Sequence, residues 1–417
     1  MVKPLLRQLS ITTLGHGLEK VIALIVVTVL VHRIDKNLIG EFFFAISVCT
    51  VAALFNEFGT SRYLVRSVAQ DRERAAANLG GVLGLRLPLL ALTILAINVA
   101  VAVSAPHLLW IFLFTSIYVL FENLYYAFGS TLLGVGAVAT RVATGLVGPL
   151  LLLMFVPAAA LWHWPLDRIV VIYAAATSVM AVVGYLAVVR EIGPVTISRS
   201  AAPTRGIVVQ WSLLFAVNAV MMLHSRVDEW MLAGMRDFRD VAGYAAAYKL
   251  LEVSRSVIRP VTMVLFPLFA AGAARAAWEQ MRARTKRVFW ATGLIGTIVA
   301  VSVIAVAPWL IPLLFGDDYP ETVAITRVLF LASPCLLVGY VAALVSSSLH
   351  LDRAVLVFAV VSVALNAALN FVAIPSWGAI GAAWTTLTTE SLLTIALVSF
   401  ALQKLSVTDS TVAETTS

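Results

Sequence analysis

Residues 287–314 read RVFWATGLIGTIVAVSVIAVAPWLIPLL and contain no charged side chain after Arg287. An apolar segment of about 20 residues is what a helix needs to cross the hydrocarbon core of a bilayer. Strands that cross bilayers instead alternate apolar and polar side chains over about 10 residues, and this segment does not alternate. It therefore predicts a membrane-spanning α-helix.

Similar apolar runs fill most of the chain. Of its 417 residues, 61% are hydrophobic and 12% are charged, whereas soluble proteins carry about 25% charged residues. No polar stretch is long enough to form a soluble domain, so we predict an all-α polytopic membrane protein with about twelve transmembrane helices. The expected spans are 11–32, 38–64, 78–103, 107–133, 138–160, 168–189, 206–232, 241–270, 287–314, 323–349, 354–374 and 378–402.

The distribution of basic residues predicts the orientation. When the amino terminus is placed in the cytoplasm, most Lys and Arg residues between the spans fall in inner loops, as the positive-inside rule requires. Both termini are then cytoplasmic, and the net charge of +7 does not indicate nucleic acid as a partner. The first apolar run has full span length and lacks a cleavage site, so we expect a retained helix and not a signal peptide.

A linker near the middle of the chain predicts two domains. The inner loop 190–205 contains Gly193, Pro194 and Pro203, residues typical of loops. The expected organisation is an N-terminal six-helix lobe at 1–200, a C-terminal six-helix lobe at 201–405 and a disordered cytoplasmic tail at 406–417.

A short internal similarity favours a duplication. Residues 33–42 resemble residues 236–245, and both are expected to enter a helix just after an outer turn. Two parallel halves would follow, although coincidence is the alternative for so few identities.

Many ionisable side chains lie inside the expected spans. A charge at the bilayer centre costs about 2.5–3.5 kcal/mol on insertion scales. Such groups are therefore expected to border the protein interior or a water-filled cavity. The candidate cavity cations are Lys20, Arg62, Arg86, Arg226, Lys249, Arg255 and Arg259, and the candidate coupling or pairing carboxylates are Glu57, Glu122, Asp228, Glu252 and Glu390.

The expected span 241–270 carries the densest group of charges. Lys249, Glu252, Arg255 and Arg259 are spaced by three or four residues and share one face of a helix. The local excess of cations favours a phosphate or carboxylate ligand, which Arg binds through two parallel hydrogen bonds. Mutual pairing of these side chains is the alternative.

The remaining polar residues do not decide whether transport is coupled to an ion gradient. Glu57, Glu122 and Glu390 are candidates for taking up a proton, with plain helix–helix hydrogen bonding as the alternative. Asn366 and Asn370 are expected to join helices. The sequence contains neither a P-loop nor metal-ligand spacing, and its outer loops are too short for a catalytic region. We therefore expect a non-enzyme without catalytic residues, metal or cofactor, coupled to H+ or Na+ if coupled at all.

Several motifs occur in a characteristic order. Residues 226–232 read RVDEWML, residues 241–252 read VAGYAAAYKLLE, and the outer turn 315–319 reads FGDDY. Residues 366–383 contain Asn366, Asn370, Ile374, Pro375 and several glycines. Residues 40–42 and 56–59 form two further, less distinctive motifs. Together these motifs resemble the Wzx-type polysaccharide flippases of the MOP exporter superfamily.

The resemblance implies a V-shaped, MATE-like transporter whose central cavity opens alternately to each side. The implied cargo is an undecaprenyl-pyrophosphate-linked oligosaccharide, moved to the outer leaflet of the bacterial inner membrane for O-antigen lipopolysaccharide, capsule or exopolysaccharide. Membrane lipid, a polysaccharide polymerase and a chain-length regulator are the implied partners. The residues implied to hold the pyrophosphate or acidic sugars are Arg226, Lys249, Arg255 and Arg259 and, with a looser match, Lys20, Arg62 and Arg86.

Two other functions remain open at this point. A MATE-like antiporter of small molecules or cations would share the fold. A membrane-embedded glycan polymerase or ligase would instead do chemistry on a lipid-linked sugar.

Overall fold

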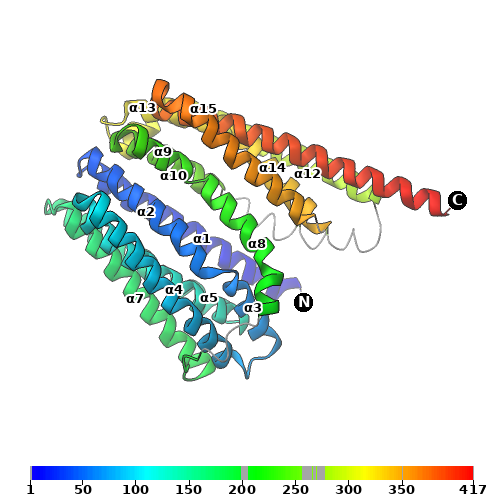
Figure 1. The fold of residues 1–417 in the computed structure, drawn as a ribbon, viewed down its shortest axis with the longest axis horizontal. Coiled ribbons are helices and arrows are strands. Elements are labelled where there is room, and N and C mark those ends of the chain that lie inside the picture. The colour runs from blue at the N-terminus through cyan, green and yellow to red at the C-terminus, as the bar shows by residue number, and fades with distance from the viewer. Residues whose placement is uncertain are drawn as a thin grey trace. The chain divides into compact units, whose positions relative to one another are not determined.

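The chain forms two compact units, which we call unit 1 (Met1–Phe215) and unit 2 (Ala216–Ser417). The computed structural model describes the backbone of residues 2–198, 205–255, 265, 269, 278–349 and 351–416, and the side chains of residues 11–198, 215–254, 265, 269, 278–349 and 351–406. Across these ranges the regular structure is entirely helical (Figure 1). The all-α prediction is confirmed.

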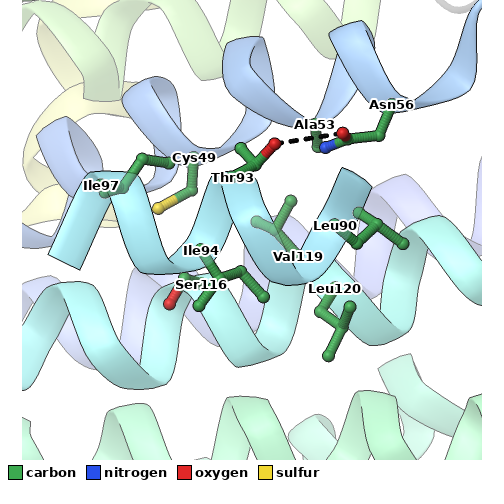
Figure 2. Close-up of a pocket in the computed structure, with 10 residues that line it drawn as sticks. All are labelled: Cys49, Ala53, Asn56, Leu90, Thr93, Ile94, Ile97, Ser116, Val119 and Leu120. Atoms are coloured by element: carbon green, nitrogen blue, oxygen red, sulfur yellow. Dashed lines mark hydrogen bonds between the residues drawn. The ribbon is translucent and has the colours of Figure 1, made fainter. Parts of the chain in front are cut away.

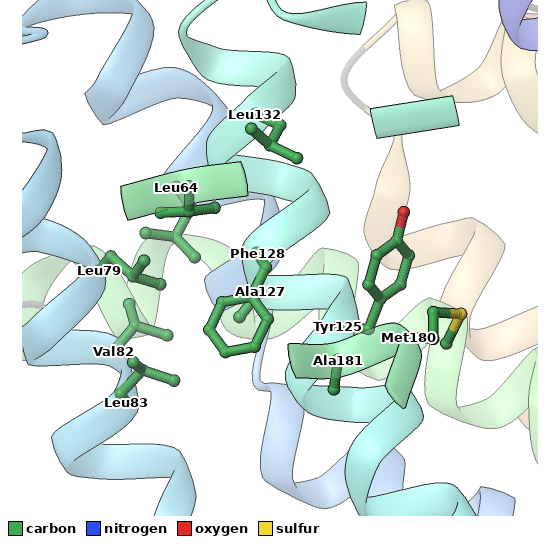
Figure 3. Close-up of a cluster of buried hydrophobic side chains, with 11 residues drawn as sticks. Leu64, Leu79, Val82, Leu83, Tyr125, Ala127, Phe128, Leu132, Met180 and Ala181 are labelled. Atoms are coloured by element: carbon green, nitrogen blue, oxygen red, sulfur yellow. The ribbon is translucent and has the colours of Figure 1, made fainter. Parts of the chain in front are cut away.

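Unit 1 is built on long apolar helices. Its elements are α1 (Val2–Val31), α2 (Lys36–Glu57), α3 (Thr60–Gln70), α4 (Ala75–Ser104), the 3-10 turn η1 (Pro106–Leu108), α5 (Leu109–Gly134), α6 (Val138–Leu161) and α7 (Leu166–Ile192). A buried cluster lies where α3, α4, α5 and α7 meet (Figure 3). Tyr125 and Phe128 of α5 stand in it beside Leu79 of α4 and Met180 of α7. Close packing of such helices, and not hydrophobicity alone, holds them together in lipid.

Unit 2 is also built from helices. Helix α8 (Arg205–His224) runs across the boundary between the units, and the following elements are α9 (Val227–Met235), α10 (Phe238–Arg255), α12 (Trp278–Phe315), α13 (Pro320–Leu331), α14 (Ser333–Ser348) and α15 (Asp352–Thr416). The two similar segments of the sequence each contain a turn followed by a helix start, at Lys36 of α2 and Phe238 of α10. That part of the repeat prediction is confirmed.

Three expected spans are not continuous helices. Helix α2 ends at Glu57 because Phe58 and Gly59 adopt left-handed backbone conformations, with φ of 41° and 72°. The expected span 206–232 is interrupted at Ser225–Arg226, and the span 323–349 is interrupted at Ala332. Each interruption frees backbone groups that must find partners inside the protein.

Helix α15 contains two arms joined at Gly378. The glycine has φ of 57° and ψ of −140°, a conformation that side chains exclude. A Cβ atom there would also lie 2.8 Å from Oδ2 of Asp240. The arms correspond to the expected spans 354–374 and 378–402.

The described residues contain nine helical stretches that are long and apolar enough to cross a membrane, the last of which includes both arms of α15. Large apolar side chains on these helices are exposed, among them Leu92 and Leu95 on α4, Trp290 on α12 and Phe371 on α15. In lipid this exposure carries no hydrophobic penalty. The protein is a multi-pass membrane protein.

The expected domain limits stay predictions. Residues 199–204 of the expected linker lie outside the described residues, and α15 extends through the expected tail as far as Thr416. The V-shaped arrangement of two lobes also stays a prediction.

Gly80 permits a close contact that we expect alanine to disrupt. A Cβ atom at Gly80 would lie 2.0 Å from the backbone oxygen of Thr196, and Ser198 donates a backbone hydrogen bond to Gly80 at 3.2 Å. The Gly80→Ala variant should lower the thermal unfolding midpoint of the purified protein. Gly17→Ala is the matched control, because nothing lies within 4 Å of a Cβ there and alanine gains up to about 1 kcal/mol of helix propensity. Equal midpoints for the two variants would contradict the contact.

Candidate functional site

The short helix α9 places the carboxylate of Asp228 in the interior of unit 2. Asp228 and Glu229 occupy its first turn, where the partial positive charge of a helix N-terminus favours anions. Asp228 is 1% exposed. Tyr244 of α10 donates a hydrogen bond to its Oδ2 at 2.5 Å, and Thr386 of α15 donates to the same oxygen at 2.7 Å.

The other oxygen of Asp228 is bound from the first arm of α15. Asn370 donates through Nδ2 to Oδ1 of Asp228 at 2.6 Å and to Oδ1 of Asn366 at 3.0 Å. Thr385, on the second arm, donates to Oδ1 of Asn370. We call Asp228, Tyr244, Asn366, Asn370, Thr385 and Thr386 the Asp228 cluster. It ties α9 and α10 to both arms of α15.

Among the side chains that the structure describes, no basic group matches the charge of Asp228. Among the described residues, no Lys, Arg or His nitrogen lies within the 4.0 Å of an ion pair with Asp228. Three neutral donors satisfy the carboxylate as an anion, but none of the described side chains compensates its charge with an ion pair, and charge is costly at membrane depth. A monovalent cation or a proton is the species that would compensate it.

Two ion pairs lie beside this cluster. Nη1 of Arg226 is 3.0 Å from Oε1 of Glu229, and Nζ of Lys249 is 3.1 Å from Oε2 of Glu252. Arg226 also interacts electrostatically with Glu252 and with Tyr248. The structure thus brings together three of the predicted site residues, Arg226, Lys249 and Glu252, with Glu229. Arg226 and Lys249 are each paired with a carboxylate, which agrees with the alternative that the charged side chains of this region pair with one another.

The other two cations of the predicted stripe cannot be placed. The side chain of Arg255 and the whole of Arg259 lie outside the described residues. Their role as cargo ligands stays a prediction.

Glu390 lies against a histidine. Oε1 of Glu390 is 3.7 Å from Nε2 of His224, and the two residues are 7% and 5% exposed. His224 ends α8 immediately before the interruption at Ser225–Arg226. Sequence reasoning did not assign a role to His224, because the six histidines are scattered along the chain and form no motif.

Arg86 of unit 1 is enclosed in protein. It is 0% exposed. Its Nε donates to Thr60 Oγ1 at 2.7 Å, its Nη2 donates to Ser61 Oγ at 2.9 Å, and its Nη1 donates to the Asn123 carbonyl oxygen at 3.2 Å. Glu57 adds an electrostatic interaction. Arg86 therefore holds α3, which begins at the break after α2, against α4 and α5.

The other predicted residues of unit 1 are more accessible. Arg62 is exposed on α3, and Lys20 and Glu57 are half-buried. Glu122, also half-buried, accepts a hydrogen bond from Tyr126 at 3.4 Å. Of these four side chains, Glu57 interacts electrostatically with Arg86, and cargo binding by Lys20, Arg62 and Arg86 stays a prediction.

A pair that sequence reasoning did not single out joins α1 to α6. Nη1 of Arg141 is 3.7 Å from Oε1 of Glu19, and Nδ1 of His16 is 3.0 Å from Oε2 of Glu19. Arg141 lies over the ring of Tyr125. The signal was available, since Glu19 lies inside the first expected span.

One pocket of unit 1 lies between α2, α4 and α5 (Figure 2). Asn56 and Thr93 line it and share a hydrogen bond of 3.1 Å, while most other lining side chains are apolar. Its cavity volume is about 10 Å³, room for about one water molecule and far less than the roughly 300–1,000 Å³ of a small-molecule site. It is too small for a lipid-linked sugar.

Solved structures show the same fold. An inward-facing multidrug resistance MATE family transporter of the MOP superfamily superposes with a TM-score of 0.75 at 14% identity, over 94% of this chain and 96% of the other. The lipid II flippase MurJ, in an inward closed conformation, gives a TM-score of 0.72 at 12% identity, over 95% of this chain and 90% of the other. A MOP superfamily transporter from Pyrococcus furiosus gives 0.70 at 14% identity, over 97% and 96%.

Sequence comparison adds the family. No curated protein matches the chain. The sequence pattern of the family described as "Polysaccharide biosynthesis protein" matches residues 5–273, which is more than half of the chain. The resemblance inferred from the motifs is thereby confirmed: the chain belongs to the polysaccharide biosynthesis protein family and has the fold of the MOP superfamily transporters.

Proposed function

We propose that the protein is a flippase for an undecaprenyl-pyrophosphate-linked oligosaccharide. It moves this cargo by alternating access from the inner to the outer leaflet of the bacterial cytoplasmic membrane, and it carries out no chemistry on the cargo. Membership of a polysaccharide biosynthesis family, in a chain folded like the lipid II flippase MurJ, is the observation that carries the proposal. The product serves O-antigen, capsule or exopolysaccharide assembly, where a polymerase and a chain-length regulator receive it.

The buried carboxylate Asp228 supports coupling to a cation gradient. A proton or a sodium ion that neutralises Asp228 from one side of the membrane and leaves toward the other would change the charge of the cluster that joins α9 and α10 to both arms of α15. The oxygen atoms of Asn370 and Thr386 are of the ligand type that hard cations prefer. Transport driven separately by a proton and a sodium gradient in proteoliposomes distinguishes the two ions.

The cationic stripe is the part of the site to test for cargo binding. We expect the Arg255→Ala/Arg259→Ala double variant to abolish surface polysaccharide in cells that depend on this gene, because the fork-shaped guanidinium groups would no longer hold a pyrophosphate. Protein level should stay normal. The matched control is Arg282→Ala/Arg284→Ala, which removes two exposed arginines of α12. Full retention of polymer in the first double variant contradicts a cargo role for the stripe.

Deletion of the gene distinguishes the alternatives. An antiporter like the multidrug MATE transporter of the same fold predicts drug sensitivity with normal polysaccharide. A polymerase or ligase predicts that the purified protein converts lipid-linked sugar without moving it between leaflets. Loss of polysaccharide, with lipid-linked precursor accumulating in the inner leaflet, supports the flippase.

A further inference from the structure

His224 and Glu390 form a buried pair that is not part of the Asp228 cluster. Both residues are more than nine-tenths buried, and the distance from Nε2 of His224 to Oε1 of Glu390 is 3.7 Å. Within the described residues neither ring nitrogen of His224 has a hydrogen-bond partner. An imidazole buried with two unsatisfied nitrogens costs free energy, whereas an imidazolium at this position would face a carboxylate.

The side chain of His224 lies at the C-terminal end of helix α8, where the helix dipole stabilises a positive charge. His224 lies in the last turn of α8, the end of a helix that carries partial negative charge. The first turn of α9, just beyond the interruption, holds the acidic residues Asp228 and Glu229. The interruption therefore places a base at a helix C-terminus and acids at a helix N-terminus, which is the arrangement that both helix dipoles stabilise.

The pair lies close to the Asp228 cluster along the chain. His224 precedes Asp228 by four residues, and Glu390 follows Thr386 by four residues, about one helical turn. Thr386 binds Asp228 at 2.7 Å, and Glu390 faces His224. The α8–α9 segment and the second arm of α15 are thus joined by two successive polar contacts, one at Asp228 and one at His224.

We propose that His224 and Glu390 form a proton-binding site that controls the contact between the α8–α9 interruption and α15 during transport. The proton binds to the lone pair of a His224 ring nitrogen, and the imidazolium pairs with the Glu390 carboxylate. Its release leaves neutral imidazole and a weakened contact, which frees the interruption to bend. The proposal rests on the transport function, and it adds His224 as a residue that positions these helices.

Other titratable groups lie on the helices that pack against α15. Helices α9, α10, α12, α13 and α14 all pack against α15. Arg226 lies just before α9, and α15 itself carries Asp352, Arg353 and Lys404. The described titratable or charged side chains of the other helices are Asp228, Glu229, Arg239, Asp240, Tyr244, Tyr248, Lys249, Glu252, Glu279, Arg282, Arg284, Lys286, Arg287, Glu321, Arg327, Cys335 and Tyr340. Among the described residues, the ion-pair partner of His224 is Glu390 alone.

A spectroscopic experiment tests proton binding without any cargo. The full-length protein is labelled with ¹⁵N-histidine in lipid nanodiscs, and the His224→Gln spectrum is subtracted from the wild-type spectrum. We expect the difference signal to change from imidazole to imidazolium within about pH 5–8, the range in which histidine titrates in proteins. Glu390→Gln should shift that transition. A difference signal that stays constant over this range, or one that Glu390→Gln leaves unmoved, overturns the proposal.

The pH profile of transport tests the functional part. In proteoliposomes, the change of the transport rate of an undecaprenyl-pyrophosphate-linked oligosaccharide between pH 5 and pH 8 should shrink about threefold or more in His224→Gln, which removes titration but keeps a donor. His32→Gln, an exposed histidine of unit 1, should keep the wild-type profile. An unchanged profile in both His224→Gln and Glu390→Gln overturns the proposal and leaves the flippase function standing. If wild-type protein moves no cargo, the flippase proposal fails and so does the role of this site in transport, whatever the spectrum shows.

Discussion

Replacing Asp228 with asparagine is expected to lower transport about tenfold or more, equivalent to at least roughly 1.4 kcal/mol, and to remove its dependence on the coupling cation. The substitution keeps the size of the side chain and removes its charge. Asparagine then offers one acceptor oxygen where Tyr244, Asn370 and Thr386 now donate to two. No cation is needed to neutralise the cluster in this variant, so a gradient has nothing to act on at this position.

The measurement is the rate at which the cargo moves between the leaflets of proteoliposomes under an imposed proton or sodium gradient, normalised to the amount of reconstituted protein. Asp317→Asn is the matched control, since Asp317 is an exposed carboxylate in the loop before α13. It should transport like the wild type. Asp228→Asn protein that keeps both its rate and its gradient dependence would show that the carboxylate only ties helices together.

The helices could be predicted because membrane span length is a local property of sequence. A run of apolar residues such as 287–314 specifies a helix wherever it lies in the bilayer. The interruptions at Phe58–Gly59 and Ser225–Arg226 could not be predicted in the same way. Phe58 is apolar and has φ of 41°, so hydropathy does not reveal the break in the helix. The break depends on the packing of α3 against α4 and α5.

The candidate site could be predicted in its charged members and in Asn366 and Asn370, which are expected to join helices and do so. Asp228 and Glu390 stand out in apolar runs because charge at membrane depth is costly. Their partners do not stand out, since Tyr244, Thr386 and His224 are residue types that membrane helices contain for many reasons. Thr386 is 158 residues from Asp228 along the chain, so only the fold joins them. The sequence also cannot tell which cation of a span faces a cavity and which is enclosed, and Arg86 is enclosed.

Arg86→Ala is expected to cost about 3–5 kcal/mol of stability, the range observed when a buried charged network is broken. The substitution leaves a cavity the size of an arginine side chain and removes the hydrogen bonds to Thr60, Ser61 and Asn123 that hold α3 in place. Arg86→Lys should recover only part of this loss, because one ammonium group cannot reach three partners that the guanidinium reaches through separate nitrogens. Thermal unfolding of the purified variants in detergent measures the effect.

Arg62→Ala separates this structural role from cargo binding. Arg62 is exposed on α3, so its removal should change stability by no more than about 0.5 kcal/mol. If the exposed cations of α3 contact an anionic cargo, Arg62→Ala lowers surface polysaccharide at normal protein level, whereas Arg86→Ala lowers protein level and polysaccharide together. Arg86→Ala protein with a wild-type unfolding midpoint and no polysaccharide would contradict this assignment. It would place Arg86 in the cargo path, in a conformation that exposes it.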